Sequence, residues 1–137
     1  MRTLNYISGD ADIYQPIEEE DIKYVEKELD CLLPDELKDI YRTPNLNLIK
    51  RLPTLLWILH HDTMGILEVN RYLYTRDYDP FPSTIIAFAT NECGDFWVIN
   101  KMDQSIVYID PDESVAENLL DKELCYRDFS EWLKRYK

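Results

Sequence analysis

Three short apolar runs near the middle of the chain constrain its fold more than any other feature. They cover residues 84–89, 96–100 and 105–109, and only a few residues separate each from the next. Short turns join antiparallel neighbours, because a parallel pair needs a crossover of about a dozen residues or more. We therefore predict that these runs form an antiparallel meander, with the strand at 96–100 in the middle.

The second and third of these runs are apolar on both faces, because residues 96–99 and 106–109 show no alternation with polar side chains. A strand of this kind needs cover on both sides of the sheet. Helices can cover one face, and the other must meet loops, a second layer or a partner.

Helical patterns stand on both sides of the predicted sheet. The first opens at residues 16–20, where Pro16 suits a first turn and the carboxylates favour the positive end of the helix dipole. A second, shorter helix follows Pro34, and a third closes the chain, with Asp128 and Glu131 spaced as a capping box. Their expected core residues are Ile22, Val25 and Leu29, then Leu37, Ile40 and Tyr41, and last Phe129, Trp132, Leu133 and Tyr136.

The predicted fold class is α+β: two N-terminal helices, a central antiparallel meander and a C-terminal helix packed on it. The 137 residues contain no repeat or linker, so we expect one domain over 1–137, with 1–15 as a lead-in segment.

Residues 47–53 follow no clear pattern, and the conformation of 43–54 stays open. Residues 72–82, rich in tyrosine and broken by two prolines, are predicted to be a loop with partial order, and the capping spacing of 114–117 indicates a short helical turn.

The charge of the chain limits its partners. Twenty-seven acidic residues stand against fifteen Lys and Arg, for a net charge of −12. Nucleic-acid binding needs cations that displace phosphate counterions, so we expect no nucleic-acid partner, and anionic membranes are disfavoured by the same repulsion. A basic protein would be attracted, although the charge can also serve only to keep the protein in solution.

The cysteines and the N-terminus indicate a cytoplasmic protein. Cys31, Cys93 and Cys125 are an odd number without CxxC spacing, which argues against a disulfide framework. Residues 1–6 lack the apolar run of a signal peptide, and the longest apolar stretch, 55–59, is far shorter than the ~20 residues of a membrane span. Oligomeric state is not indicated.

The sequence favours a binding protein over an enzyme. Only three glycines are present, and no phosphate-binding or nucleophile-elbow motif occurs. His60 or His61 with Cys93 is the dyad to consider, and the same pair with Asp62 is the metal site to consider. Neither has supporting spacing, so we predict no catalytic residues, no metal and no cofactor.

Two acidic loops are the candidate partner-binding site. Glu92 and Asp95 flank Gly94, which most simply provides a positive φ in the turn between two strands. Asp110, Asp112 and Glu113 follow the next strand, at the end where an antiparallel meander would also place the first turn. We expect both loops to be exposed and able to face a basic partner, because loops on a rigid scaffold often carry recognition. The alternative is that these charges only keep the two turns solvated and bind no partner.

The aromatic residues add two further candidates. Trp57 and Trp132 are expected in the core. Trp97 is expected there as well, with a partly exposed anchor for a partner as the alternative, since interfaces favour tryptophan. The tyrosine-rich stretch 72–78 can be recognition surface or a loop that covers the sheet.

The order of these motifs resembles the SUKH superfamily, bacterial immunity proteins related to yeast regulators of cell-wall synthesis. Three segments carry the resemblance, and together they span about residues 17–136: 33–38 (LPDELK), 85–100 (IIAFATNECGDFWVIN), and 106–108 with Asp110 followed by 128–133 (DFSEWL). One departure is Asn45-Leu46, where the family usually has Asn-Gly after the second helix.

The resemblance implies a protein that binds and neutralises a cognate toxin, often a nuclease, used between competing bacteria. An acidic inhibitor of a basic nuclease is physically coherent. A regulatory scaffold that binds cellular proteins is the second interpretation, and a small enzyme of unrecognised type is the third.

Overall fold

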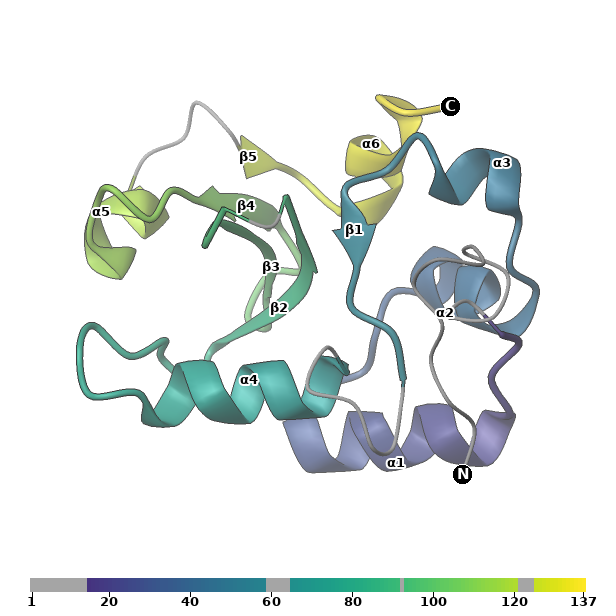
Figure 1. Cartoon of the computed structure of the whole chain (residues 1–137), viewed down its shortest axis with the longest axis horizontal. Coiled ribbons are helices and arrows are strands. Elements are labelled where there is room, and N and C mark those ends of the chain that lie inside the picture. Colours follow the sequence, from purple (N-terminus) through teal and green to yellow (C-terminus); the bar gives the residue numbers. More distant parts are fainter. Residues whose placement is uncertain (1–14, 59–64, 92, 121–124) are drawn as a thin grey trace.

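The computed structural model describes residues 15–58, 65–91, 93–120 and 125–137 and has an α+β fold (Figure 1). Within these residues, the elements in chain order are α1 (Glu19–Leu29), α2 (Asp35–Arg42), α3 (Leu46–Ile49), β1 (Thr54–Leu55), α4 (Ile66–Thr75), β2 (Ile85–Thr90), β3 (Phe96–Asn100), β4 (Ile106–Ile109), α5 (Val115–Leu120), β5 (Cys125–Tyr126) and α6 (Phe129–Lys134). The predicted fold class is confirmed.

The sheet is a meander in the order β1-β2-β3-β4-β5, and every neighbouring pair is antiparallel. Its central strands β2, β3 and β4 begin and end within one residue of the three predicted runs. The edge strands β1 and β5 have two residues each, too few to show a pattern in the sequence. A bulge between Ala87 and Ala89 shifts the register of β2 against β3.

Both faces of the sheet are covered, which meets the requirement set by its doubly apolar strands. On one face, the ring of Trp132 on α6 lies 5.0 Å from Phe88 on β2 and 5.8 Å from Trp97 on β3, centroid to centroid. On the other face, the ring of Phe81 in the loop after α4 lies 5.9 Å from that of Phe96 on β3, centroid to centroid. Helix α4 itself flanks the edge of β2, where Asn70 donates a hydrogen bond of 2.9 Å to the carbonyl of Ala87 and accepts one of 2.8 Å from its amide. Helix α1 lies along α4, and α2 contacts α6 (Figure 1).

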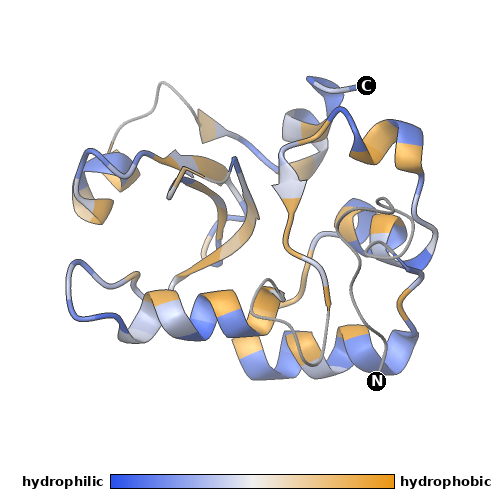
Figure 2. Ribbon diagram, viewed as in Figure 1, coloured by the Kyte–Doolittle hydropathy of each residue, from blue (hydrophilic) through white to orange (hydrophobic). Residues whose placement is uncertain are grey.

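The two N-terminal helices follow the predicted pattern. Their expected core residues, three in each helix, are all buried. Pro16 lies before α1, whose N-cap is Glu18, whereas Pro34 is the N-cap of α2. Figure 2 shows the apolar faces of these helices turned toward the interior. The ring of Tyr41 packs edge-on against Trp57 at 4.8 Å, which ties α2 to the chain after β1.

Helix α4 corrects the predicted loop at 72–82. Its buried residues Ile66, Leu67, Asn70 and Leu73 follow helical spacing, so the first residues of that stretch are helical and the loop starts at Arg76. The sequence does not reveal this pattern, because Asn70 is a polar residue at a buried position. Its burial is possible only because it forms hydrogen bonds with the backbone of β2. Residues 43–54, whose conformation the sequence left open, contain the short helix α3. Asn45 caps this helix by accepting a hydrogen bond of 3.2 Å from the Leu48 amide.

The N-cap bond of each predicted capping box near the C-terminus is confirmed, whereas the Glu131 carboxylate accepts its hydrogen bond from the Arg127 amide and not from that of Asp128. Asp128 accepts a hydrogen bond of 2.9 Å from the Glu131 amide at the start of α6, and Ser114 accepts one of 3.1 Å from the Glu117 amide at the start of α5. Trp57 and Trp132 are buried, as expected. None of the helices described is both long enough and apolar enough to cross a lipid bilayer.

Candidate protein-binding surface

Strand register brings the two predicted acidic loops to one end of the sheet. Phe96, the first residue of β3, pairs with Ile109, the last residue of β4, so the turn before β3 and the loop after β4 lie side by side. A Cβ atom placed on Gly94 would lie 3.8 Å from Cβ of Pro111. The expected juxtaposition of these loops is therefore present in the structure.

The turn between β2 and β3 is closed by Asp95. Its carboxylate accepts hydrogen bonds from the backbone amide of Asn91 at 3.1 Å, from the Asn91 side chain at 3.0 Å and from the Tyr108 hydroxyl at 2.5 Å. Its carbonyl oxygen accepts a bond of 2.6 Å from the Thr90 hydroxyl. Gly94 has a φ of 82°, as predicted for this position.

The expectation that Asp95 is exposed is wrong, because its side chain turns inward and the residue is only 3% exposed. Burial raises the pKa of the Asp95 carboxyl, but the hydrogen bonds from Tyr108 and Asn91 outweigh it and hold that pKa below its usual value. The carboxylate is thus charged at neutral pH. It stabilises the turn from its buried side, through the hydrogen bonds from Asn91 and Tyr108.

Trp97 is a core residue, the interpretation that the sequence favoured over a partly exposed anchor. It is 5% exposed, and its ring centroid lies 5.0 Å from that of Tyr108 and 5.9 Å from that of Tyr126. Together with Trp132, these rings form an aromatic layer between the sheet and α6. Trp97 is therefore not positioned to contact a partner directly. It supports the surface residues by packing beneath them.

The loop after β4 presents its carboxylates on a firmly held backbone. Asn118 on α5 accepts a hydrogen bond of 2.9 Å from the Asp110 amide and donates one of 2.9 Å to the Asp110 carbonyl. The carboxylate of Asp110 in turn accepts a bond of 2.9 Å from the Asp112 amide. Asp112 and Glu113 are exposed, as expected, whereas Glu92 lies outside the described residues.

The loop after α4 forms the other wall of this region. Arg76 donates hydrogen bonds of 3.0 and 2.8 Å from Nε and Nη2 to the carbonyl of Asp79, and its guanidinium lies 5.1 Å from the ring centroid of Phe81. Asp79, with a φ of 48°, accepts a bond of 2.9 Å from the Val115 amide at the start of α5. The two loops are thus joined directly.

A groove of about 190 Å³ lies between these loops. We call it the sheet-end groove, and its lining includes Tyr78, Gly94, Asp110, Asp112 and Glu113. Tyr78 is 87% exposed. The sequence indicated the acidic loops and the tyrosine-rich stretch as separate candidates. It did not indicate Arg76 or Asp79, because their role depends on a contact with α5, 36 residues further along the chain.

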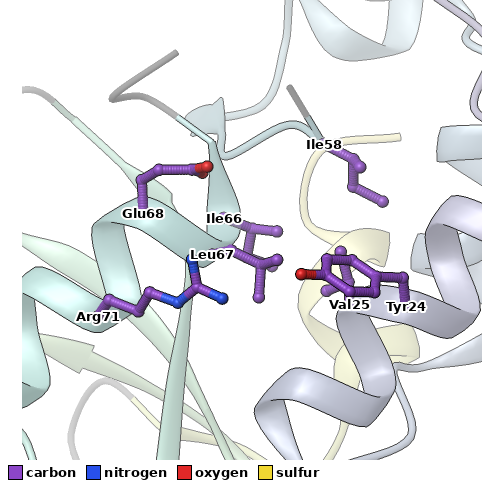
Figure 3. Close-up of a pocket in the computed structure, with 7 residues that line it drawn as sticks. All are labelled: Tyr24, Val25, Ile58, Ile66, Leu67, Glu68 and Arg71. Atoms are coloured by element: carbon purple, nitrogen blue, oxygen red, sulfur yellow. The ribbon is translucent and has the colours of Figure 1, made fainter. Parts of the chain in front are cut away.

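A second cavity, of about 130 Å³, lies between α1 and α4 (Figure 3). Val25, Ile66 and Leu67 give it an apolar floor, and Tyr24, Ile58, Glu68 and Arg71 complete the described lining. Arg71 also forms an ion pair of 2.9 Å with Glu28, which connects the two helices across its edge. This cavity is much smaller than the roughly 300–1,000 Å³ of typical small-molecule sites.

The catalytic and metal alternatives rest on residues that the structure does not place. His60, His61 and Asp62 lie outside the described residues, and Cys93 is an exposed free thiol. In the described part of the chain, no group of three His, Cys, Asp or Glu side chains is arranged to hold a metal ion. Cys31 and Cys125 are free thiols as well.

Comparison with known protein families agrees with this architecture. The model of the SMI1 / KNR4 family (SUKH-1) matches residues 16–135, which is nearly the whole chain. The chain belongs to this family. SUKH proteins of this type are generally binding proteins without enzymatic activity. No curated protein and no solved structure matches the chain.

Proposed function

We propose that this SUKH protein is an immunity protein, which binds a cognate toxin protein and neutralises it by masking the toxin's active or substrate-binding face. Membership of the family supports a protein-binding role. The observation that carries the proposal is the set of carboxylates from Asp110, Asp112 and Glu113 on one side of a groove. A charged, concave surface on a rigid sheet is suited to recognition of another protein.

The proposed partner is basic, and a nuclease is the toxin class that fits best. A nuclease needs Lys and Arg on its substrate-binding face to displace phosphate counterions. The same face would be attracted to a chain of net charge −12. Complementary charge raises association rate constants by about 10- to 1,000-fold, which matters for an inhibitor that must act before its toxin does.

The surface needs little rearrangement on binding. The side-chain oxygens of Asn118, Asp79 and Asp95 accept hydrogen bonds from backbone amides and so fix the loops that line the groove. A preorganised surface loses less conformational entropy when it binds, so more of the interaction free energy appears as affinity. In this proposal Asp95 and Trp97 contribute by supporting the surface, and Asp112 and Glu113 by contacting the toxin.

Co-expression tests the proposal directly. The chain would be expressed with the protein encoded by the gene immediately upstream, which the proposal expects to be the toxin, and cell survival would be compared with that of cells expressing that protein alone. We expect protection by the wild-type chain and loss of protection by the Asp112→Lys/Glu113→Lys variant. The matched control is Asp35→Lys/Asp39→Lys, which makes the same change in net charge on α2, away from the groove.

Other outcomes would identify the alternatives. Many cellular binding partners without protection from any neighbouring toxin would contradict the immunity function and favour a regulatory scaffold. Catalytic turnover that is lost on substitution of His60, His61 or Cys93 would favour an enzyme.

A further inference from the structure

The sheet-end groove combines a buried apolar floor with a tyrosine on its rim. Phe81, Ile109 and Val115 are each less than 5% exposed and lie at the bottom of the lining, whereas Tyr78 is 87% exposed. A tyrosine ring offers rigid, amphipathic contact area at low entropic cost. The groove therefore provides a flat aromatic surface that no other described side chain covers.

The charges of the lining favour a cation as occupant. Four carboxylates line the groove against a single guanidinium, and that guanidinium is held by the Asp79 carbonyl and the Phe81 ring. The carboxylates of Asp79 and Asp110 accept hydrogen bonds from backbone amides. Those of Asp112 and Glu113 are exposed at the rim, where they can meet a positive charge.

The size of the groove favours one side chain over a small-molecule ligand. Its volume of about 190 Å³ is below the roughly 300–1,000 Å³ of small-molecule sites. A metal ion is disfavoured as well, because no three potential ligands converge in the described residues. A cationic side chain from a protein partner is small enough for this volume and needs no set of three metal ligands.

We infer that the sheet-end groove binds an arginine side chain of the protein partner, an inference that rests on the proposed function. A guanidinium stacks on an aromatic ring and pairs with carboxylates through two parallel N–H donors, so Tyr78 with Asp112 and Glu113 matches both of its modes of recognition. Lysine offers only a compact charge. The aliphatic part of the arginine would lie against the apolar floor.

Titration with single amino-acid derivatives tests this inference without the toxin. ¹⁵N-labelled protein would be titrated with N-acetyl-arginine amide, the lysine analogue and the neutral citrulline analogue, and backbone amide shifts followed by NMR. We expect saturable shifts at Gly94, Asp112 and Glu113 with a Kd on the order of 1 mM for arginine. Lysine should bind about three- to fivefold more weakly, and citrulline should produce no saturable shift.

Matched variants assign the binding to the groove. Tyr78→Leu should weaken arginine binding about three- to fivefold. The control Tyr72→Leu removes an exposed tyrosine that lies on α4 and does not line the groove, so it should leave arginine binding unchanged. Equal shifts with arginine and citrulline, or no saturable shift at about ten times the expected Kd, would overturn the inference.

The two proposals can fail separately. If arginine binds in the groove but the chain protects cells from no toxin, the groove assignment stands and the immunity function fails. If the chain protects cells through Asp112 and Glu113 but arginine does not bind, the immunity function stands and the arginine inference fails.

Discussion

The hydroxyl of Tyr108 on β4 donates a hydrogen bond of 2.5 Å to the carboxylate of Asp95, which closes the turn between β2 and β3. This bond crosses from one strand to its neighbour and joins the turn to the strand that leads into the acidic loop. One buried acid thus holds together the two segments that form the candidate surface. Burial and the bond to Asp95 raise the pKa of Tyr108 well above its usual value, so the hydroxyl stays protonated.

Replacement of Asp95 by asparagine should lower the free energy of unfolding by about 1.5–3 kcal/mol at pH 7, because hydrogen bonds to a charged acceptor are lost. Urea unfolding followed by tryptophan fluorescence measures this difference. Asp112→Asn, at an exposed position, should change stability by no more than about 0.5 kcal/mol. Equal effects of the two substitutions would show that the Asp95 network is not stabilising.

The contribution of Asp95 should depend on pH in a defined direction. Its pKa is lowered by folding, so its stabilising effect is complete above the ordinary value of 3.8 and is lost as the pH falls through the lower pKa of the folded state. The difference in unfolding free energy between wild type and Asp95→Asn should be constant from about pH 5 to 7 and shrink below about pH 4. Urea titrations across this range test it, and a difference that grows toward low pH would contradict it.

Gly94→Ala should lower the free energy of unfolding by about 1 kcal/mol, since alanine tolerates a φ of 82° poorly. The added Cβ would be at an ordinary contact distance of 3.8 Å from Pro111, so the cost is conformational and not steric. Gly94→Asn should cost less, because asparagine adopts positive φ more readily. Equal losses for both variants would point to crowding at Pro111 instead.

Asn118→Ala should destabilise the acidic loop and the protein by about 2–3 kcal/mol. The residue is 4% exposed and bonds to both backbone groups of Asp110, so its removal leaves buried polar groups without partners. Hydrogen exchange should show faster exchange at the Asp110 amide than at the amides of β3. Uniformly faster exchange throughout the sheet would indicate a global effect and not a local one.

The central strands could be predicted from the sequence because the signal for each is local. Continuous apolar runs and short turns define β2, β3 and β4 and also place the two acidic loops at one end of the sheet. Helix α4 was missed because Asn70 interrupts its apolar stripe. The structure shows that this asparagine is buried against the backbone of Ala87, a contact between residues 17 positions apart.

The candidate surface could be predicted only in part. Acidic side chains in a turn usually face water, so nothing local indicated that Asp95 turns inward to a tyrosine on another strand. The groove also depends on Asp79, whose positive φ and bond to Val115 are set by the packing of α5 against the loop after α4. Long-range contacts of this kind leave no periodic pattern in a single sequence.

The affinity of the purified chain for the proposed toxin, measured by calorimetry at low and high salt, tests the central claim most directly. Asp112→Lys/Glu113→Lys should weaken binding by at least about tenfold, equivalent to about 1.4 kcal/mol, and reduce its salt dependence. The Asp35→Lys/Asp39→Lys control should bind within about threefold of wild type. An unchanged affinity and salt dependence for the groove variant would contradict the account.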